Sequence, residues 1–484
     1  MIEVTFKDAI ELMRLFRITD VMRKKVRHIH FVGIGGIGMS GIAEVLLNLD
    51  YMVSGSDLKI SETTERLASL GATVFQGHKA SNLADVDVVV TSTAVRQDNP
   101  EVLEAHRRAI PVIPRAEMLA ELLKMKVSIA VSGSHGKTTT TSMIATVMAA
   151  GGLDPTMVIG GKLGSIGSNA RVGQGEFIVA EADESDGSFL KLSPSLAVIT
   201  NIDREHLDYY RGIEDIKAAF LQFANIVPFY GSAILCLDDP HIKTILSDIK
   251  RKTITYGLEP AADYRAEGIR FTGTSTEYGL YNRAEFMGTI TLSVPGLFNV
   301  YNSLATVAVA RELEMSFPAI REGLKSYVGV GRRLEVKEVV AGVTVVDDYG
   351  HHPTEISATL AAARQVWKSR MIVVFQPHRY TRTQALFREF LGAFTEADLL
   401  IVTDIYPASE DPIEGVTAEA LCDGIRSLTN REVLYIPDFN HITDYLMSIV
   451  QPGDVVITQG AGSVNQVGMS LLNRLKEAGD FRAA

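Results

Sequence analysis

The chain contains only two cysteines and one tryptophan in 484 residues, and it has no apolar run of about 18 residues that could span a bilayer. Cys236 and Cys422 lie far apart in separate apolar stretches, which favours reduced core thiols over a disulfide framework or a cysteine metal site. Residues 1–27 mix acidic and basic side chains and lack the apolar core of a secretory signal. We therefore expect a soluble, cytoplasmic protein with no membrane partner.

Positive charge is also scarce, because 47 lysines and arginines face 58 acidic residues and leave a net charge of -11. This balance argues against a general nucleic-acid binder, since phosphate backbones are held by clustered Lys and Arg. Any anionic substrate must be held by local positive groups. At roughly 100–200 residues per domain, the length predicts three domains, and both a monomer and a homodimer are compatible with the sequence.

The most informative stretch is a loop rich in glycine and hydroxyl groups. Residues 127–131 predict a buried strand and residues 137–150 predict a helix. The loop between them is Gly133-Ser134-His135-Gly136-Lys137-Thr138-Thr139. In a P-loop, glycines let the backbone approach the phosphates, the lysine meets the β- and γ-phosphate oxygens, and the following hydroxyl holds Mg²⁺. The stretch predicts a nucleoside triphosphate site.

This loop departs from the commonest P-loop. The pattern G-x-x-x-x-G-K would place glycine at position 131, where the chain has Val131, so the loop is a shorter G-x-x-G-K-T-T-T. The alternative interpretation is a Gly/Ser turn with an N-capping hydroxyl and no ligand. The order of strand, loop, Lys-Thr and helix favours the phosphate site.

A second glycine-rich turn lies near the N-terminus, between an expected strand at 28–32 and an expected helix at 40–49. Its residues Gly33-Ile34-Gly35-Gly36-Ile37-Gly38 match G-x-G-x-x-G, and Asp57 follows the next expected strand at 52–54, where an acid can bind a ribose. Alone, the turn is typical of a nicotinamide dinucleotide site. Any diphosphate-linked ligand, such as a UDP-sugar, can bind to the same helix N-terminus through its phosphates. A tight turn without a ligand remains an alternative.

Three parallel α/β modules are expected along the chain. The first also has strands at 73–75, 86–91 and 112–113. The second continues from the P-loop through strands at 177–180, 196–201 and 233–237 and a helix at 215–227, with an antiparallel insertion at 254–294 before a helix at 302–313. In the third module, strands alternate regularly with amphipathic helices, which predicts a doubly wound unit. The strands are expected at 343–346, 371–375, 399–403, 433–436 and 454–458.

Acidic residues and a histidine follow two strands of the second module. Glu181 ends its strand and is our first choice as a Mg²⁺ ligand beside Thr138, with Asp183 or Glu184 as substitutes. The alternative is a solvated acidic turn. His206 lies among acids beyond the next strand and could bind a second metal ion, although a lone histidine is more often structural.

Two polar stretches follow strands of the third module, at 347–354 and 376–383. Ligands collect at the carboxyl ends of parallel strands, and Arg379 and Arg382 could clamp a carboxylate there. Taken singly, each arginine is equally compatible with a solvated surface side chain.

Together these stretches resemble the Mur ligase family from about residue 26 to the C-terminus. The resemblance rests on six motifs, at residues 28–41, 133–141, 181–189, 331–333, 347–355 and 375–383. It implies an α/β fold with a Rossmann-like UDP-sugar domain at 1–126 that includes a leader at 1–25, a central P-loop ATP domain with an antiparallel insertion at 127–333, and a C-terminal doubly wound, Rossmann-like amino-acid domain at 334–484. Met22 could equally be the start of the chain.

The family uses ATP to phosphorylate a muramate carboxylate, and an amino-acid amine then attacks the acyl phosphate, in peptidoglycan precursor synthesis. The motifs are most similar to the branch that adds L-alanine to UDP-N-acetylmuramate. The resemblance implies ATP and two Mg²⁺ ions as cofactors. It assigns the ATP phosphates to the loop residues Gly133, Ser134, His135, Gly136, Lys137, Thr138 and Thr139, with Lys137 also catalytic.

The resemblance also carries over the remaining site residues. For ATP it implies adenine contacts by Asn299 and Asn302, a phosphate contact by Arg333 and a ribose contact by Asp348. The metal ligands would be Thr138, Glu181 and His206, with His206 bridging to the muramate carboxylate. The UDP-sugar would contact Gly35, Gly36, Ile37, Gly38, Met39, Ser40, Asp57, Ser92, Thr93 and Asn169. The alanine and acyl-phosphate region would be lined by Tyr349 and the catalytic residues His351, Arg379 and Arg382.

Two positions depart from the family pattern. Phe298 replaces a histidine that often precedes the first asparagine, so the contact with adenine there would be stacking in place of a hydrogen bond. Sister ligases have a carbamylated lysine at a position that is Leu221 here, and Lys217 is off register, so we expect no carbamylated lysine.

Three other functions remain open. A recycling ligase would attach a whole tripeptide to the same acceptor, but residues 376–383 resemble the alanine branch. A dinucleotide-dependent oxidoreductase would use Gly33–Gly38 and leave the P-loop unexplained. A nucleotide-switched binding protein would release phosphate without regard to alanine.

Overall fold

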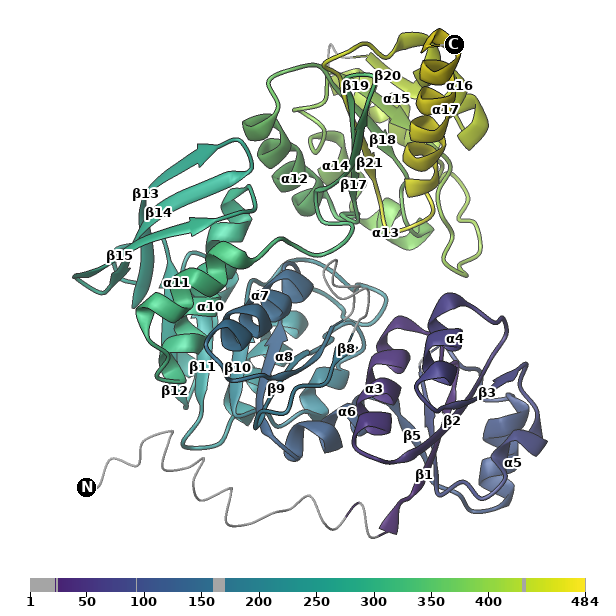
Figure 1. The fold of residues 1–484 in the computed structure, drawn as a ribbon, viewed down its shortest axis with the longest axis vertical. Helices are drawn as coiled ribbons and strands as arrows, with labels where there is room; N and C mark the ends of the chain where they lie inside the picture. The colour runs from purple at the N-terminus through teal and green to yellow at the C-terminus, as the bar shows by residue number, and fades with distance from the viewer. Residues whose placement is uncertain (1–21, 23–24, 93, 160–169, 429–431, 484) are drawn as a thin grey trace. The chain divides into compact units, whose positions relative to one another are not determined.

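The computed structural model describes residues 22, 25–92, 94–159, 170–428 and 432–483. Almost all of the leader expected at 1–25, and the expected substrate residues Thr93 and Asn169, lie outside the described residues. The ribbon in Figure 1 shows an α/β fold with three sheets, which confirms the predicted fold class.

The first sheet has five parallel strands in the order β3-β2-β1-β4-β5. This order brings the carboxyl ends of β1, β2 and β4 to one edge, where ligands bind in open sheets. The helix after β1 begins at Ile37, three residues before the expected start, so its first turn belongs to the glycine-rich turn. The elements are β1 (His28–Val32), α3 (Ile37–Asn48), β2 (Met52–Asp57), α4 (Glu62–Ser69), β3 (Thr73–Gln76), η1 (Ala80–Leu83), β4 (Val88–Thr91), α5 (Pro100–Arg107), β5 (Val112–Pro114) and α6 (Arg115–Lys124).

The second sheet has ten strands in the order β15-β14-β13-β12-β11-β10-β6-β9-β7-β8. Its central strands are parallel and buried, and the P-loop strand β6 lies between β10 and β9. The elements up to the last parallel neighbours are β6 (Val127–Ser132), α7 (Lys137–Ala150), β7 (Thr156–Val158), β8 (Ala170–Arg171), β9 (Phe177–Glu181), η2 (Ser188–Lys191), β10 (Leu196–Ile199), α8 (Ile213–Ile226), β11 (Ser232–Cys236), α9 (Pro240–Ile245), η3 (Leu246–Asp248) and β12 (Lys252–Gly257).

The prediction of an antiparallel insertion at 254–294 is only partly right. Strand β12 pairs with β11 in parallel, so it extends the nucleotide-binding sheet. The strands β13 (Tyr264–Thr272), β14 (Ser275–Asn282) and β15 (Glu285–Leu292) are neighbours joined by very short turns, which requires antiparallel hairpins. The helices α10 (Leu297–Glu312) and α11 (Phe317–Ser326) follow.

The third sheet has the order β16-β17-β21-β18-β19-β20. The last five strands are parallel, as predicted for a doubly wound unit, and β16 adds an antiparallel edge strand that we did not predict. The elements are β16 (Glu335–Val340), β17 (Val343–Asp348), α12 (Pro353–Val366), β18 (Met371–Phe375), α13 (Tyr380–Ala385), α14 (Phe387–Leu391), β19 (Leu399–Val402), α15 (Ala418–Leu428), β20 (Glu432–Tyr435), α16 (Phe439–Ile449), β21 (Val455–Gln459) and α17 (Asn465–Ala483).

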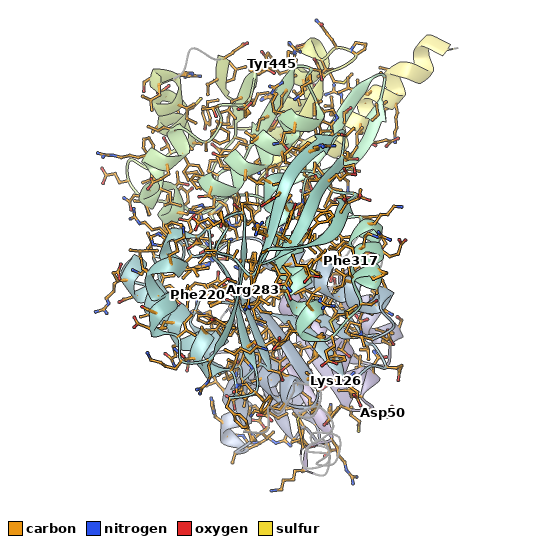
Figure 2. The ribbon with its side chains drawn as sticks, turned by 90° about the vertical axis from the view of Figure 1, so that its left-hand side faces the viewer. Asp50, Lys126, Phe220, Arg283, Phe317 and Tyr445 are labelled. Carbon is orange, nitrogen blue, oxygen red and sulfur yellow. The ribbon has the colours of Figure 1, made fainter. Side chains whose placement is uncertain are left out.

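Apolar cores cover both faces of the third sheet. Val346 of β17 belongs to one core and its neighbour Val345 to the other, as the two-residue period of a strand requires. Beside the second sheet, Phe220 of α8, labelled in Figure 2, is fully buried. Its ring contacts that of Phe189, which in turn contacts the ring of Phe223. Both cysteines are buried free thiols, and every helix in the described part of the chain is too short or too polar to cross a membrane.

The chain divides into two compact units. The first comprises Met1–Gly268, Tyr278–Thr291 and Tyr301–Val328, and the second comprises Ile269–Glu277, Leu292–Val300 and Gly329–Ala484. The first unit thus contains the first sheet and the P-loop, and the second contains the third sheet. The predicted domain boundaries at 126 and 333 stay a prediction.

Candidate functional site

The P-loop has the backbone that its glycines predict. Gly133 has φ +133° and Gly136 has φ +85°, both in the region that favours glycine. A Cβ at Gly133 would lie 2.0 Å from Thr200 Oγ1, and a Cβ at Gly136 would lie 2.9 Å from Asn302 Oδ1. Neither glycine can therefore be replaced without moving the loop.

Helix α7 begins directly after the loop, at Lys137. The first intrahelical amide bond of this turn runs from Thr140 N to Gly136 O. The amides of Gly136, Lys137, Thr138 and Thr139 make no hydrogen bond with another described residue. Such a helix start presents N–H groups and a positive dipole to an anion, as predicted for a phosphate site.

The Lys137 ammonium is held inside the loop by three acceptors. Its Nζ donates to Gly133 O at 2.6 Å, to Ser134 O at 3.1 Å and to Glu184 Oε1 at 2.7 Å. Burial alone would lower the pKa of Lys137, but the adjacent Glu184 and Glu205 carboxylates outweigh it and raise the pKa. The lysine is therefore a permanent cation at the loop.

Glu184 also approaches His206. His206 Nε2 lies 3.4 Å from Glu184 Oε1 and 3.8 Å from Glu205 Oε2, and Glu184 is 2% exposed. Burial by itself lowers the pKa of His206, but the hydrogen bond to Glu184 and the charge of Glu205 outweigh it, so the pKa is raised. Glu184, Glu205 and His206 each offer one potential ligand atom, and these three atoms lie within 4.8 Å of one another, close enough to bind one metal ion.

The backbone at His206 is unusual, with φ +54° in a residue that carries a Cβ. Non-glycine residues in this region are uncommon and gather at functional sites. Of the predicted metal residues, Thr138 lies in the first turn of α7, and Glu181 ends β9 in register with Val131 of the P-loop strand. The carboxylate paired with Lys137 is Glu184, one of the two alternatives to Glu181 in the sequence.

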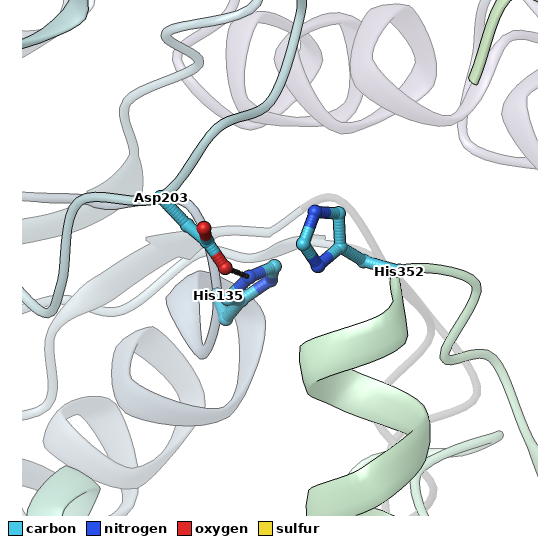
Figure 3. A group of neighbouring side chains, drawn as sticks. All are labelled: His135, Asp203 and His352. Carbon is cyan, nitrogen blue, oxygen red and sulfur yellow. Dashed lines mark hydrogen bonds and ion pairs between the residues drawn. The ribbon is translucent and has the colours of Figure 1, made fainter. Parts of the chain in front are cut away.

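The segment after β10 supports the P-loop from one side. Asp203 N donates to Ser134 Oγ at 2.8 Å, and the Asp203 carboxylate lies 3.0 Å from His135 Nε2 (Figure 3). The side-chain amide of Asn201 hydrogen bonds to the main-chain N–H and C=O of His135. Sequence reasoning missed Asn201 and Asp203, because their partners lie more than 60 residues away in the chain. His352, also drawn in Figure 3, belongs to the second unit and is the N-cap residue of α12.

The two predicted adenine residues lie one helical turn apart on α10. Asn302 is buried, and its Oδ1 accepts a hydrogen bond from Thr140 Oγ1 at 3.1 Å, next to the P-loop. Asn299 is also buried, and its Nδ2 donates to Pro295 O at 2.7 Å. Phe298 packs against Gly296, which has φ +97°.

The glycine-rich turn of the first sheet is tied to the end of β2. Gly33 N and Ile34 N both donate to Ser56 O, and Gly35 N donates to Asp57 Oδ2 at 2.9 Å. Asp57 therefore lies at the turn, as predicted. The residues Gly36, Ile37, Gly38, Met39 and Ser40 form the N-cap and first turn of α3, and Ser92 directly follows β4 at the same sheet edge.

A basic residue that the sequence analysis missed also lies at this turn. A Cβ at Gly38 would lie 2.9 Å from Arg115 Nη1, so the guanidinium of Arg115 packs against the start of α3. Arg115 Nη2 also lies 3.2 Å from Asp183 Oδ2. Arg115 follows β5, the last strand of the first sheet, and no local motif marks it.

In the second unit, Asp348 is almost fully buried and makes several internal hydrogen bonds. Its carboxylate accepts from Leu334 N and Gly350 N, both at 2.8 Å, and from Gln459 Nε2 at 2.7 Å. Burial raises the pKa of Asp348. Arg333, one residue before Leu334, lies 3.3 Å from Glu355 Oε1 and over the ring of Tyr349.

Five aromatic and basic side chains form a cluster beyond the carboxyl ends of β17, β18 and β19. The ring of His351 contacts those of Tyr349 and His378, and His378 stacks on Tyr406 with centroids 5.5 Å apart. Arg382 Nη1 donates to His378 Nδ1 at 3.2 Å. Burial and the nearby cations lower the pKa of His378 to about 3, so this ring is neutral.

Arg379 begins the helix that carries Arg382. It has φ +70°, and its guanidinium lies 3.8 Å from Glu410. The structure thus brings His351, Arg379 and Arg382 to one edge of the third sheet, as the strand-end argument predicted. Their contact with a substrate remains a prediction.

Three family models match consecutive parts of the chain. Residues 28–127 match "Mur ligase family, catalytic domain", residues 131–310 match "Mur ligase middle domain", and residues 332–462 match "Mur ligase, glutamate ligase domain". Together they cover most of the chain and confirm the resemblance derived from the motifs.

Curated proteins and solved structures are similar over nearly the full length. The UDP-N-acetylmuramate–L-alanine ligase of Syntrophus aciditrophicus is 88% identical over 472 residues, which is 98% of both chains. The ligase of the same name from Geotalea daltonii is 60% identical and covers 94% of this chain and 100% of its own. A crystal structure of UDP-N-acetylmuramate-alanine ligase from Thermotoga maritima matches with a TM-score of 0.79 at 29% identity, covering 93% of this chain and 99% of its own.

Proposed function

The chain belongs to the Mur ligase family, and on that premise we propose that it joins L-alanine to the carboxylate of UDP-N-acetylmuramate, with ATP cleaved to ADP and phosphate. The observation that carries the proposal is the position of Lys137. It lies between a helix start with unbonded amides and a cluster of two carboxylates and a histidine. A free carboxylate is a very poor acyl donor, so amide formation requires such an activating site.

In the first half-reaction, an oxygen of the muramate carboxylate attacks the γ-phosphorus of ATP, and the bond to the ADP oxygen breaks. Charge spreads over the transferring phosphoryl oxygens, and catalysis consists mainly of positioning and charge stabilisation. The amides of Gly136 to Thr139 and the Lys137 ammonium are the groups of this chain that serve that purpose. Lys137 must exchange its bond to Glu184 for one to a phosphate.

The acidic cluster fits Mg²⁺ by its donor chemistry. Carboxylate oxygens and a hydroxyl are hard ligands, and Glu184, Glu205 and His206 present atoms within 4.8 Å of one another. We propose Thr138, Glu181 and His206 as ligands, with Glu184 beside them, and two ions in total. When bound, Mg²⁺ neutralises charge on the phosphate oxygens.

In the second half-reaction, the alanine amine attacks the acyl carbon and forms the C–N bond. The C–O bond to the phosphate breaks, the phosphate leaves with its electrons, and the amine proton passes to water or to that phosphate. We propose that Arg379 and Arg382 hold the alanine carboxylate and the departing phosphate, with Tyr349 and His351 beside them. Their clustering at one sheet edge supports this assignment. We assign Asn299, Asn302, Arg333 and Asp348 to ATP.

We propose that the UDP-sugar binds at the glycine-rich turn of the first sheet. The turn is held by Asp57, begins a helix at Ile37 and has the Arg115 guanidinium against it. A helix start and an arginine suit a diphosphate. A cytoplasmic location, in peptidoglycan precursor synthesis, accords with the two buried free thiols. We propose a monomer or a homodimer, which sedimentation of the purified protein distinguishes.

Phosphate release from the purified protein tests the proposed reaction. ATP and Mg²⁺ are supplied with UDP-N-acetylmuramate alone, L-alanine alone, both together, or the UDP-sugar with the tripeptide in place of alanine. Release that requires the UDP-sugar and alanine together is the expected result. Release only with the tripeptide would identify a recycling ligase, and release that ignores alanine would identify a nucleotide-switched binding protein.

A further inference from the structure

The P-loop of this chain is shorter than the commonest form, because Val131 stands where a glycine begins the longer loop. A shorter loop has fewer of its own residues with which to fix its shape. In this structure the missing support comes from the segment that follows β10, and Asn201 makes its central contacts.

Asn201 brackets the main chain of a single loop residue. Its Oδ1 accepts the N–H of His135 at 2.8 Å, and its Nδ2 donates to the carbonyl oxygen of the same residue at 3.0 Å. The main-chain oxygen of Asn201 also accepts the N–H of Ser134 at 3.1 Å. One side-chain amide thus satisfies both the donor and the acceptor of the residue in the middle of the loop.

Neighbouring residues add to this support. Thr200 Oγ1 donates to His135 O at 2.6 Å, and Asp203 holds Ser134 Oγ and the His135 ring. Asn201 differs from them because its amide is the partner of the His135 N–H. With the His135 and Ser134 amides bound inside the protein, the amides that remain for an anion are those of Gly136 to Thr139.

We infer that Asn201 is a positioning residue for the triphosphate of ATP. It fixes the main chain on both sides of His135, so that the four amides after it converge on the phosphate groups. The inference rests on the proposed ATP site and adds a residue outside its motifs. It predicts that removing the amide loosens the loop before any nucleotide binds. It also predicts that the loss falls on nucleotide affinity and spares the UDP-sugar site.

The test compares Asn201→Ala and Asn201→Leu with a matched control. Leucine preserves the shape of asparagine and cannot hydrogen bond, so it separates packing from bonding. Asn225→Ala is the control, because Asn225 lies in the same module and its amide also both donates and accepts. Its Nδ2 donates to Leu221 O at 3.1 Å and to Asp248 O at 3.5 Å, and its Oδ1 accepts from Lys250 N at 2.7 Å. Those bonds lie away from the P-loop.

Two measurements are made on each full-length variant below its melting temperature. Hydrogen–deuterium exchange of the free protein reports on residues 133–139, and calorimetric titration gives the affinities for ADP with Mg²⁺ and for UDP-N-acetylmuramate. Two net hydrogen bonds are worth about tenfold or more in affinity. We expect both Asn201 variants to exchange faster across the loop and to bind ADP at least about tenfold more weakly, with UDP-sugar affinity unchanged. Asn225→Ala should match the wild type in both.

Unchanged loop exchange and ADP affinity in the folded Asn201 variants would overturn the inference. Equal losses of loop protection and ADP affinity in Asn225→Ala would also overturn the inference, because the effect would then reflect general destabilisation. Wild-type protein that binds no ADP would refute the proposed ATP site, and the exchange data on the free protein would still decide whether Asn201 fixes the loop.

Discussion

Lys137 and Glu184 form an ion pair with 2.7 Å between Nζ and Oε1, in which the lysine side chain is 20% exposed and the glutamate side chain 2%. Three acceptors occupy the lysine, so a phosphate can be bound by Lys137 only in exchange for one of them. The carboxylate released from the lysine then remains beside His206, where a cation can replace the ammonium. The pair therefore links the phosphate site to the acidic cluster.

Replacing Lys137 by alanine should abolish ligation and spare the UDP-sugar site, because the two sites lie on different sheets. We expect phosphate release to fall by roughly 10²–10³-fold or more, since the loop loses its cation. UDP-N-acetylmuramate affinity, measured by calorimetry, should stay within twofold. Loss of that affinity would refute the modular assignment. Lys217→Ala, which removes an ion pair to the exposed Glu214 in the same module, is the control.

The same variant also tests the energetics of the pair. Alanine at 137 leaves the Glu184 carboxylate buried without its main partner, which typically costs about 3–5 kcal/mol. Adding Glu184→Gln removes the stranded charge, so the double variant should unfold at higher urea than Lys137→Ala. Equal or lower stability of the double variant would show that the pair is not coupled in this way.

The P-loop could be predicted because all its signals are local: a buried strand, two glycines, Lys-Thr and a helix follow one another within 24 residues of the chain. The carboxylate that pairs with Lys137 could not be predicted in this way. Glu181 ends the strand, as the motif argument required, but the turn that follows it carries Glu184 back to Lys137. Asn201 and Arg115 were missed because their contacts are set by the pairing of β10 and β5 with distant strands.

Replacing Arg115 by alanine should weaken UDP-N-acetylmuramate binding. The guanidinium packs against Gly38 at the start of α3, where a diphosphate would bind, and charge-assisted bonds are worth about 1.5–3 kcal/mol, or roughly tenfold or more in affinity. ADP affinity should be unchanged. Arg107→Ala, which removes an exposed arginine from the neighbouring helix α5, serves as the control. Equal UDP-sugar affinity in both variants would remove Arg115 from the site.

Replacing Asp348 by asparagine should destabilise the second unit as well as reduce activity. The carboxylate accepts three short hydrogen bonds, two on Oδ1 from Gly350 N and Gln459 Nε2 and one on Oδ2 from Leu334 N. Asparagine keeps one acceptor oxygen, but its amide nitrogen cannot accept, so one or two of these donors lose their partner. We expect a loss of about 2–3 kcal/mol. Urea unfolding followed by the fluorescence of Trp367, the chain's single tryptophan, measures it because that side chain packs on the core of this unit. A variant that loses activity at full stability would indicate a ligand contact alone.

The third sheet shows a second limit of sequence reasoning. Its five parallel strands are continuous apolar runs and were predicted within a few residues. The edge strand β16 was missed, because residues 335–340 are mostly exposed and carry two glutamates and a lysine. An edge strand is buried on neither face as fully as a central one, so its apolar pattern is weak.

Acid should destabilise the second unit through His378, and His378→Gln should remove that part of the pH dependence. The pKa of this ring is about 3 in the folded protein and near 6.5 as a reference, so between these values the unfolded chain binds a proton that the folded chain does not. Stability then falls as pH drops below 6.5, by about 2 kcal/mol at pH 5. Glutamine still offers an acceptor to Arg382. Urea unfolding at pH 7 and pH 5 with Trp367 fluorescence should show a smaller pH difference in His378→Gln than in the wild type, whereas His441→Gln, at an exposed site in the same unit, should retain the wild-type difference.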